Sequence, residues 1–279
     1  MTAAPADNPR IELVVADVDG TLVTSEKQLT ECTIAAVHAL KEAGVKFAVT
    51  SGRPPRGMQM LVQPLALTPP LAAFNGGLFV RPQDMSVIEE RSIDPALVTP
   101  IVQLIGDHRL DVWLYRGADW LLRDPHAPHV AKEAATVRFE PTVVERLDGI
   151  TEGVAKIVGI GDDLERVAEA EADARAKFGD HVSAARSQPY YLDVTHPDAN
   201  KGAVVQYFSD KYNIPTSRIA TFGDQPNDVL MFAHSGLSIA MGNASPEVQR
   251  AARKVTASND DEGFAKAIEQ FALAADARA

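Results

Sequence analysis

Short apolar runs that end in polar loops recur along the chain. Residues 13–16 form one such run, which ends at Asp17, and residues 45–49 form a second. Apolar runs of this length indicate strands that are buried on both faces, as in a parallel sheet. A helix is expected between the two runs, because Thr30 can cap its start and apolar side chains recur at helical spacing up to about Ala43. The pattern predicts an α/β fold.

Near residue 80 the rhythm changes to short strands that alternate with helices, which is typical of a separate α+β module. Helices are expected at 95–107 and at about 126–137, and near Asn200 the first pattern resumes. The sequence therefore predicts a doubly wound parallel-sheet α/β core that is interrupted by an inserted α+β cap domain. The predicted limits are 1–82 and 195–279 for the core and 83–194 for the cap.

Composition and charge narrow the possible partners and location. The chain has 279 residues, of which 46% are hydrophobic and 23% are charged, and its net charge is -11. Nucleic-acid binding is not expected, because the phosphates of nucleic acids bind to basic protein surfaces and this chain is acidic. We find no apolar stretch that resembles a signal peptide or a membrane span, so we predict a cytoplasmic protein without a membrane partner.

The cysteine content agrees with a cytoplasmic location. Cys32 is the single cysteine and cannot form an internal disulfide, which fits a reducing compartment. Because a free cysteine usually behaves as a small apolar side chain, we expect Cys32 to be buried in its helix.

Polar side chains stand at several of the expected strand ends and helix starts. Since the carboxyl ends of parallel strands share one edge of the sheet, where ligands bind, we expect these side chains to meet. Each also has a plain structural interpretation, because Asp and Asn favour turns and helix caps and a lysine at a helix start is often solvated. Their joint occurrence favours one site. The residues are Asp17, Asp19, Thr50, Ser51, Lys201, Asp224 and Asp228.

Three of these acids suit a metal-assisted phosphoryl transfer. Asp17 is a candidate nucleophile, since carboxylates form aspartyl-phosphates in other enzymes. Its attack on an anionic phosphoryl group requires charge compensation, which Mg²⁺ would supply. Asp17, Asp224 and Asp228 offer the hard oxygen ligands that Mg²⁺ prefers.

The other polar residues fit the remaining tasks of the same reaction. Lys201 and the hydroxyl of Thr50 or Ser51 would hold the phosphoryl oxygens while negative charge spreads over them. Asp19 would protonate the departing oxygen and then accept a proton from the water that attacks the aspartyl-phosphate.

Four segments taken together carry a family resemblance: Asp17-Val-Asp-Gly-Thr, Thr50-Ser-Gly-Arg, Asn200-Lys-Gly and Gly223-Asp-Gln-Pro-Asn-Asp. The set resembles the four motifs of the haloacid dehalogenase superfamily, and the large insertion between the second and third motifs resembles that of its Cof-like phosphatases. Two segments near the end, which begin at Ser238 and Ser258, resemble those that follow the fourth motif.

The resemblance implies a Mg²⁺-dependent phosphomonoester hydrolase that acts on a small organic phosphate, such as a sugar phosphate, through an aspartyl-phosphate. It implies that Asp17 is the nucleophile and Asp19 the acid and base. Mg²⁺ would be held by the side chains of Asp17 and Asp224, by the main-chain oxygen of Asp19, and through water by Asp228. Other residues would contact the phosphoryl group or lie near the substrate: Thr50, Ser51, Lys201 and Asn227 for the former, Arg53 and Asn75 for the latter.

Two other functions fit the same motifs. A phosphomutase would use the same nucleophile but would return the phosphoryl group to a second oxygen of the substrate. A non-catalytic protein that binds a phosphorylated ligand would bind without turnover, and the intact pair of Asp17 and Asp19 disfavours this function.

Overall fold

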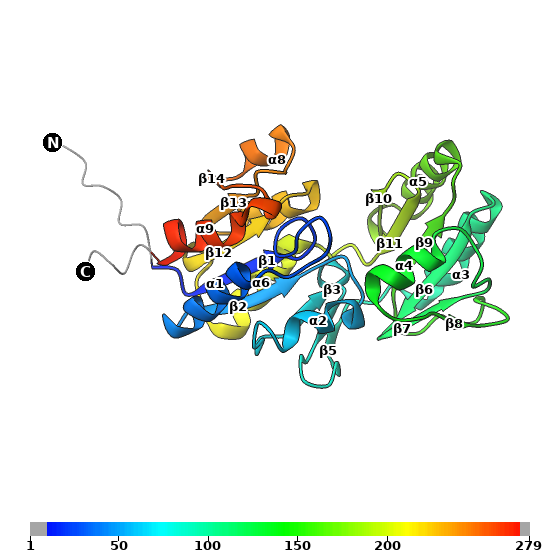
Figure 1. Ribbon diagram of the computed structural model, residues 1–279. Coiled ribbons are helices and arrows are strands. Elements are labelled where there is room, and N and C mark those ends of the chain that lie inside the picture. The colour runs from blue at the N-terminus through cyan, green and yellow to red at the C-terminus, as the bar shows by residue number, and fades with distance from the viewer. Residues whose placement is uncertain (1–9, 274–279) are drawn as a thin grey trace. The chain divides into compact units, whose positions relative to one another are not determined.

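The computed structural model describes residues 10–273, which form two compact units (Figure 1). Of the described residues, unit 1 contains 10–51, Leu61–Pro70 and 201–273. Unit 2 contains Gly52–Met60 and Leu71–Asn200. The predicted domain limits, 1–82 with 195–279 and 83–194, stay a prediction, since compact units and functional domains need not coincide.

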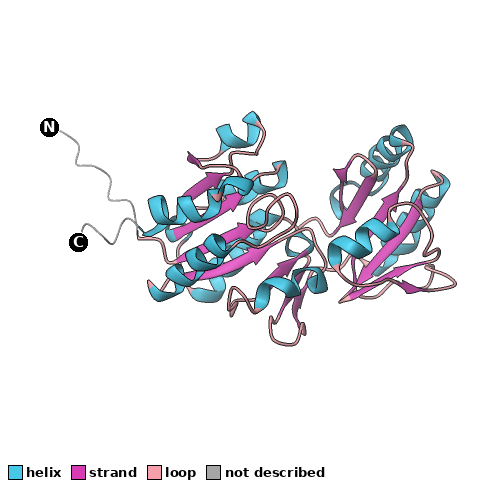
Figure 2. Ribbon diagram, in the orientation of Figure 1, coloured by secondary structure: helices cyan, strands magenta, loops and turns pink. Residues whose placement is uncertain are grey.

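Unit 1 is built on five parallel strands in the order β14-β13-β12-β1-β2. Every residue of β1 is buried, which requires cover on both faces of the sheet. The predicted parallel-sheet core is thus confirmed, and its strands and helices are distinguished in Figure 2. The strands are β1 (Leu13–Asp17), β2 (Lys46–Thr50), β12 (Ile219–Gly223), β13 (Leu237–Ala240) and β14 (Lys254–Val255).

The helices of unit 1 pack in two groups, α1 with α9 and α6 with α7. Helix α1 starts as predicted, because the Thr30 hydroxyl accepts a hydrogen bond from the Thr33 backbone N at 3.1 Å. The helices are α1 (Glu31–Glu42), α6 (Lys201–Tyr212), α7 (Val229–Ala233), α8 (Pro246–Ala251) and α9 (Gly263–Ala267), which a π-helical turn at Ile268–Leu273 continues. The chain passes between the units within α2 (Gln59–Val62).

The expected burial of Cys32 is wrong, because the cysteine is exposed. The buried stripe of α1 consists of Thr33, Ala36, Val37 and Leu40. Position 32 lies outside this stripe, so helical geometry turns its side chain toward solvent.

The strand order places a topological switch point beside β1. Strand β2 pairs with one side of β1, and β12, which comes much later in the chain, pairs with the other. Ligands of open α/β sheets bind outside the carboxyl ends of the strands at such a point. Asp17 ends β1, Thr50 ends β2 directly opposite it, and Asp224 follows β12.

Unit 2 contains a six-stranded sheet in the order β10-β11-β9-β6-β7-β8, antiparallel except for the β7–β8 pair. Helices α3 (Pro95–Asp107) and α5 (Leu164–Phe178) pack on this sheet and enclose an apolar core with it. The strands are β6 (Asp111–Arg116), β7 (Asp119–Leu122), β8 (Thr142–Val143), β9 (Val154–Ile160), β10 (Ser183–Gln188) and β11 (Tyr191–Thr195). A smaller antiparallel set consists of β3 (Leu71–Ala73), β4 (Leu78–Val80) and β5 (Val87–Glu90).

Helix α4 (Val130–Val137) starts later than the expected residue 126. His129 has a φ of 68°, which lies in the left-handed region and cannot continue a right-handed helix. The short edge strand β8 was not expected, since two residues carry no periodicity.

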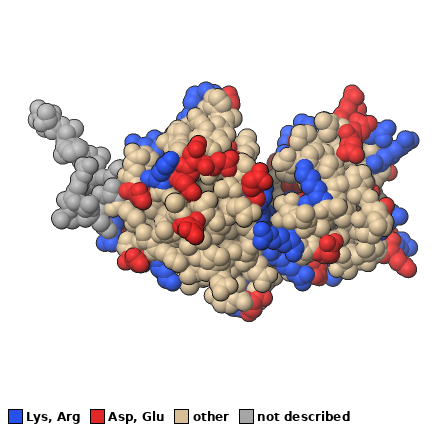
Figure 3. All heavy atoms as spheres, viewed as in Figure 1, with Lys and Arg blue, Asp and Glu red and all other residues tan. Residues whose placement is uncertain are grey.

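Among residues 10–273, no helix combines the length and the apolar character that crossing a membrane requires. Acidic and basic side chains are interspersed over the face of the molecule in Figure 3. The expected absence of nucleic-acid and membrane partners stays a prediction from composition.

Candidate active site

Three buried carboxylates converge at the switch point of unit 1. Asp17 comes from the end of β1, Asp224 follows β12, and Asp228 ends the 3₁₀ turn Pro226–Asp228. One oxygen of each carboxylate lies within 4.8 Å of the other two. The residues are only 5%, 4% and 0% exposed, respectively. The first and fourth motifs therefore meet in one buried cluster.

Lys201 supplies the cation of this cluster. It is the first residue of α6, and its Nζ donates to Asp17 Oδ1 at 2.6 Å and to Asp228 Oδ1 at 2.5 Å. Burial lowers the pKa of Lys201, but its two carboxylate partners outweigh this effect and hold the pKa above its ordinary value. The third motif thus contributes a fixed positive charge beside Asp17.

Asp228 shapes the loop as well as the charge. Its Oδ2 accepts hydrogen bonds from the backbone N atoms of Asp224 at 2.9 Å and Gln225 at 2.8 Å. A Cβ atom at Gly223 would lie 2.3 Å from Asp228 Cγ, so only glycine leaves room for this carboxylate. The Gly-Asp-Gln-Pro-Asn-Asp segment therefore folds around its own last residue.

The cluster carries an excess of negative charge. Burial raises the pKa of Asp17, Lys201 opposes this, and the carboxylates of Asp228 and Asp224 add to it. Burial also raises the pKa of Asp224 to about 6, although the Gln225 side chain lowers it. Burial among like charges therefore makes an ionised carboxylate costly here unless a further cation is present.

A divalent cation fits this donor set. Three carboxylates face one ammonium group, so ionising all of them leaves two negative charges, which one Mg²⁺ would balance. Carboxylate oxygens are the hard ligands that Mg²⁺ prefers. Asp17, Asp224 and Asp228 are the residues that would hold the ion.

Asp19 lies apart from the three buried acids. Its Oδ1 is 2.8 Å from Lys27 Nζ, and the two side chains are 32% and 45% exposed. Between Asp19 and the rest of the loop, Gly20 has a φ of 80°, and a Cβ atom there would lie 2.4 Å from Asp224 Oδ2. The turn after β1 is therefore tightly packed against Asp224.

The second motif places two hydroxyl residues next to Asp17. Thr50 pairs with Asp17 across β1 and β2, and both Thr50 and Ser51 are buried. The Thr50 Oγ1 atom has no hydrogen-bond partner among the residues that the structure describes. A buried hydroxyl without a partner is costly, so this atom is available to a ligand oxygen. Asn227 is exposed in the turn before Asp228.

Arg53 and Asn75 belong to unit 2. Arg53 is buried, and its Nη1 donates to the Gly57 carbonyl oxygen at 3.0 Å. The Arg53 carbonyl oxygen accepts from the Phe74 backbone N at 3.1 Å, which places the segments of Arg53 and Asn75 side by side. Asn75 has a left-handed backbone, with a φ of 57°.

Several residues around Asp224 were not predicted from the sequence. Asn243 Nδ2 donates to Asp224 Oδ2 at 3.3 Å and to the Gly20 carbonyl oxygen at 3.0 Å. Its Oδ1 accepts from the Asn259 backbone N at 3.1 Å. Gln225 and Thr21 also donate to the Asp224 carboxylate. Asn243 and Asn259 lie in the segments that begin at Ser238 and Ser258. The family resemblance of these segments was the available sequence signal, but it assigned the two asparagines no role.

Comparison with known proteins finds relatives that match nearly the full length of the chain. Residues 14–268 match a family described as haloacid dehalogenase-like hydrolase. The chain is 32% identical over 259 residues to a putative phosphatase of Haemophilus influenzae, covering 92% of this chain and 97% of the relative. It is 28% identical over 263 residues to a 5-amino-6-(5-phospho-D-ribitylamino)uracil phosphatase of Bacillus subtilis, covering 93% and 97%.

The fold agrees with the sequence match. A haloacid dehalogenase-like hydrolase from Bacteroides thetaiotaomicron has a crystal structure that superposes with a TM-score of 0.86 at 26% identity, covering 94% of this chain and 99% of the other. The family match includes all four motifs, and the resemblance that they carry is confirmed. The chain therefore belongs to the haloacid dehalogenase-like hydrolases.

Proposed function

We propose that this haloacid dehalogenase-type phosphatase is a Mg²⁺-dependent phosphomonoester hydrolase that works through an aspartyl-phosphate on Asp17. The observation that carries the proposal is the contact of Asp17 with a buried cation, Lys201, beside the unpartnered hydroxyl of Thr50. In-line transfer of a phosphoryl group requires a nucleophile and groups that hold the transferred oxygens. Asp17 offers the nucleophile, and Lys201 and Thr50 offer a cation and a hydroxyl at the same edge of the sheet.

In the first half of the reaction, a carboxylate oxygen of Asp17 attacks phosphorus and the bond from phosphorus to the leaving oxygen breaks. Asp19 would give its proton to that oxygen, so the alcohol departs neutral. Lys201, Thr50 and Ser51 would hold the phosphoryl oxygens meanwhile, with Asn227 beside them.

In the second half, water attacks the phosphorus of the aspartyl-phosphate. Asp19 would accept a proton from this water, the bond from phosphorus to Asp17 breaks, and inorganic phosphate leaves with the carboxylate restored. The Asp19 carboxylate pairs with Lys27 and is not one of the three clustered acids, which agrees with separate roles for Asp17 and Asp19.

Mg²⁺, when bound, would compensate the negative charge of the cluster and of the phosphoryl group. We propose the side chains of Asp17 and Asp224 and the main-chain oxygen of Asp19 as its protein ligands, with Asp228 acting through water. The buried carboxylates with raised pKa values support this assignment.

We propose a small organic phosphate as the substrate, and residues 83–194 as the cap domain that selects it, with Arg53 and Asn75 near the substrate. Full-length similarity to the 5-amino-6-(5-phospho-D-ribitylamino)uracil phosphatase supports this substrate class. That compound and a set of sugar phosphates are therefore the first substrates to assay. The protein is also expected to act in the cytoplasm.

The test is release of inorganic phosphate from p-nitrophenyl phosphate with and without Mg²⁺. Asp17→Asn keeps the size of the side chain but removes the nucleophile, so its turnover should fall by at least about 1,000-fold. The matched control is Asp210→Asn, an exposed residue of α6 that contacts the Gln206 side chain, and it should keep full activity.

The same experiment separates the alternatives. Mass spectrometry of the acid-quenched enzyme should find a phosphoryl group on the peptide that contains Asp17. Phosphate release that persists in Asp17→Asn would refute the nucleophile. Transfer to a second hydroxyl without free phosphate would indicate a phosphomutase, and binding without turnover would indicate a non-catalytic protein.

A further inference from the structure

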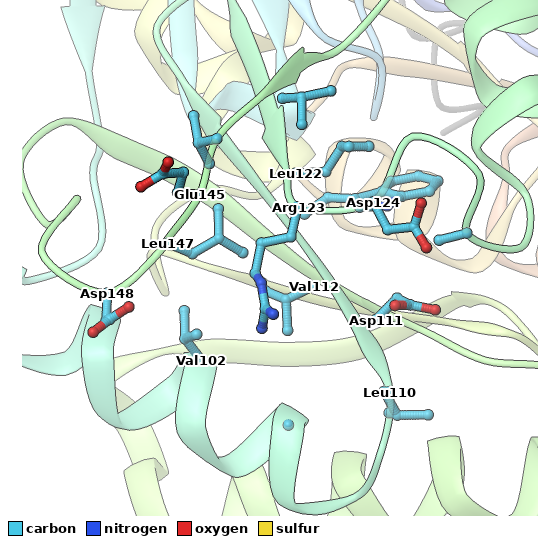
Figure 4. A pocket seen from close by; sticks show the side chains of 15 residues that line it. Val102, Leu110, Asp111, Val112, Leu122, Arg123, Asp124, Glu145, Leu147 and Asp148 are labelled. Carbon is cyan, nitrogen blue, oxygen red and sulfur yellow. The ribbon is translucent and has the colours of Figure 1, made fainter.

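Unit 2 contains a cavity of about 700 Å³ that the proposed reaction does not use (Figure 4). It lies between α3, the start of β6, the end of β7 and the segment at 143–148, and none of the residues proposed for phosphoryl transfer lines it. Its volume is in the range of sites that bind small molecules. Most of its wall is apolar: Val102, Leu110, Val112, Leu122, Val143, Val144 and Leu147.

Arg123 is the one basic residue among the lining side chains. Its guanidinium lies in the middle of the view in Figure 4, among the lining side chains. Arg123 makes no hydrogen bond or ion pair with any residue in the part of the chain that the structure describes. By contrast, the nearby Arg146 is paired with Asp148. A guanidinium has five N–H donors, so Arg123 presents a complete carboxylate-binding fork to the cavity.

Two carboxylates, those of Asp111 and Asp124, lie together on one side of the cavity (Figure 4). The Asp111 carboxylate has no hydrogen-bond or ion-pair partner within residues 10–273, and the Asp124 carboxylate accepts one hydrogen bond, from the His126 backbone N at 2.8 Å. Burial raises the pKa of Asp111, and the charge of Asp124 raises it further, whereas Arg123 lowers it. The two carboxylates therefore repel each other, and a cation between them would stabilise both.

The wall also contains a buried donor. Trp113 lines the cavity and is 1% exposed, yet its Nε1 has no hydrogen-bond partner among the described residues. A buried indole N–H normally has a partner. The cavity thus combines an apolar wall and a buried N–H donor without a partner with exposed side chains of both charges, Arg123, Asp111 and Asp124, which form no ion pair among the described residues.

We propose that this cavity binds a small zwitterion with an apolar body, such as a free apolar α-amino acid. Arg123 would bind the carboxylate, Asp111 and Asp124 would bind the ammonium group, and the apolar wall would cover the side chain. A simple anion would face the four acids that line the cavity, Asp111, Asp124, Glu145 and Asp148, and a simple cation would face Arg123. Only a molecule with both charges satisfies both sets of groups.

The proposal is tested by calorimetric titration of the full-length protein with L-phenylalanine and two matched probes. 2-Phenylethylamine lacks the carboxylate, and 3-phenylpropionate lacks the ammonium group. We expect saturable binding of phenylalanine, and binding of each matched probe that is at least about 10-fold weaker, since each loses one charge-assisted interaction.

Two substitutions assign the binding to this cavity. Arg123→Gln should weaken phenylalanine binding by at least about 10-fold and leave 2-phenylethylamine unchanged. Asp111→Asn should weaken the binding of phenylalanine and of the amine but not that of the acid. The matched control is Arg116→Gln, an exposed arginine at the other end of β6, which should bind all three probes as the wild type does.

Each remaining outcome overturns the proposal. The proposal is wrong if phenylalanine shows no saturable binding at millimolar concentration. It is also wrong if Arg123→Gln binds phenylalanine as tightly as the wild type does. If 2-phenylethylamine bound as tightly as phenylalanine, the cavity would select organic cations instead. Circular dichroism of each variant establishes that the fold is kept, and because binding is measured directly, the result is independent of the phosphatase reaction.

Discussion

Lys201 Nζ lies 2.6 Å from Asp17 Oδ1, although 184 positions separate the two residues in the chain. The contact joins the start of α6 to the end of β1. Both side chains are almost completely buried, so the attraction between them is little screened by solvent. This pair therefore links the charge of the site to the stability of the fold.

Replacement of Lys201 by Met should strongly lower the free energy of unfolding of the metal-free protein. It leaves the carboxylates of Asp17 and Asp228 buried without a cation, and breaking a buried pair in this way costs about 3–5 kcal/mol. The free energy of unfolding in urea with EDTA measures the loss. Lys211→Met, at an exposed position of the same helix, should change it by less than about 0.5 kcal/mol. Equal effects of the two variants would contradict the role of the buried pair.

Stability without metal should depend on pH through Asp224. Its pKa is about 6 in the folded protein against an ordinary value of 3.8. Because the folded state binds this proton more tightly, the contribution of Asp224 is complete below the ordinary value and is lost as pH rises through the folded value. The loss is on the order of 3 kcal/mol.

The comparison with Asp224→Asn isolates this effect. Urea unfolding of both proteins in EDTA, between about pH 4 and pH 7, should show the wild type losing stability relative to the variant. Saturating Mg²⁺ should remove the loss, since the ion stabilises the ionised carboxylate. A difference that stays constant with pH would show that Asp224 does not titrate in this range.

Gly20→Ala should damage the site more than the same change at Gly44. The two glycines have similar backbones, with φ of 80° and 76°, so both variants incur a similar strain of about 1 kcal/mol. At Gly20 the new Cβ would also lie 2.4 Å from Asp224 Oδ2, whereas at Gly44 nothing lies within 4 Å. We therefore expect phosphatase activity to fall by at least about 100-fold for Gly20→Ala but not for Gly44→Ala, because only the first change displaces the Asp224 carboxylate.

Asn243→Ala should weaken Mg²⁺ binding rather than the chemical step. Asn243 donates to Asp224 and to the Gly20 carbonyl oxygen, so it orients a proposed metal ligand without belonging to the ligand set. Loss of such a contact typically lowers metal affinity by about 10–100-fold. Activity measured against Mg²⁺ concentration should show a higher half-saturation point with a nearly unchanged maximum. A lower maximum at unchanged half-saturation would assign Asn243 another role.

The sequence by itself determined most of the local structure. Thr30 and the apolar spacing after it predicted α1, and the helix expected at 95–107 has the limits of α3. Helix caps, periodicity and apolar runs depend on residues that are close together in the sequence, so they can be recognised without knowledge of the fold. The motif residues also stand at strand ends and at one helix start, within the range that the family match covers.

Only the tertiary structure decided which of these residues touch. The β1–β12 pairing brings Asp224 to Asp17, and the start of α6 brings Lys201 between Asp17 and Asp228. Asn243 entered the site through hydrogen bonds that no local pattern encodes. Such contacts depend on how distant segments pack, and the pKa values depend on the burial that packing creates. The chain order therefore specified the chemical groups, and the three-dimensional arrangement set their distances and charges.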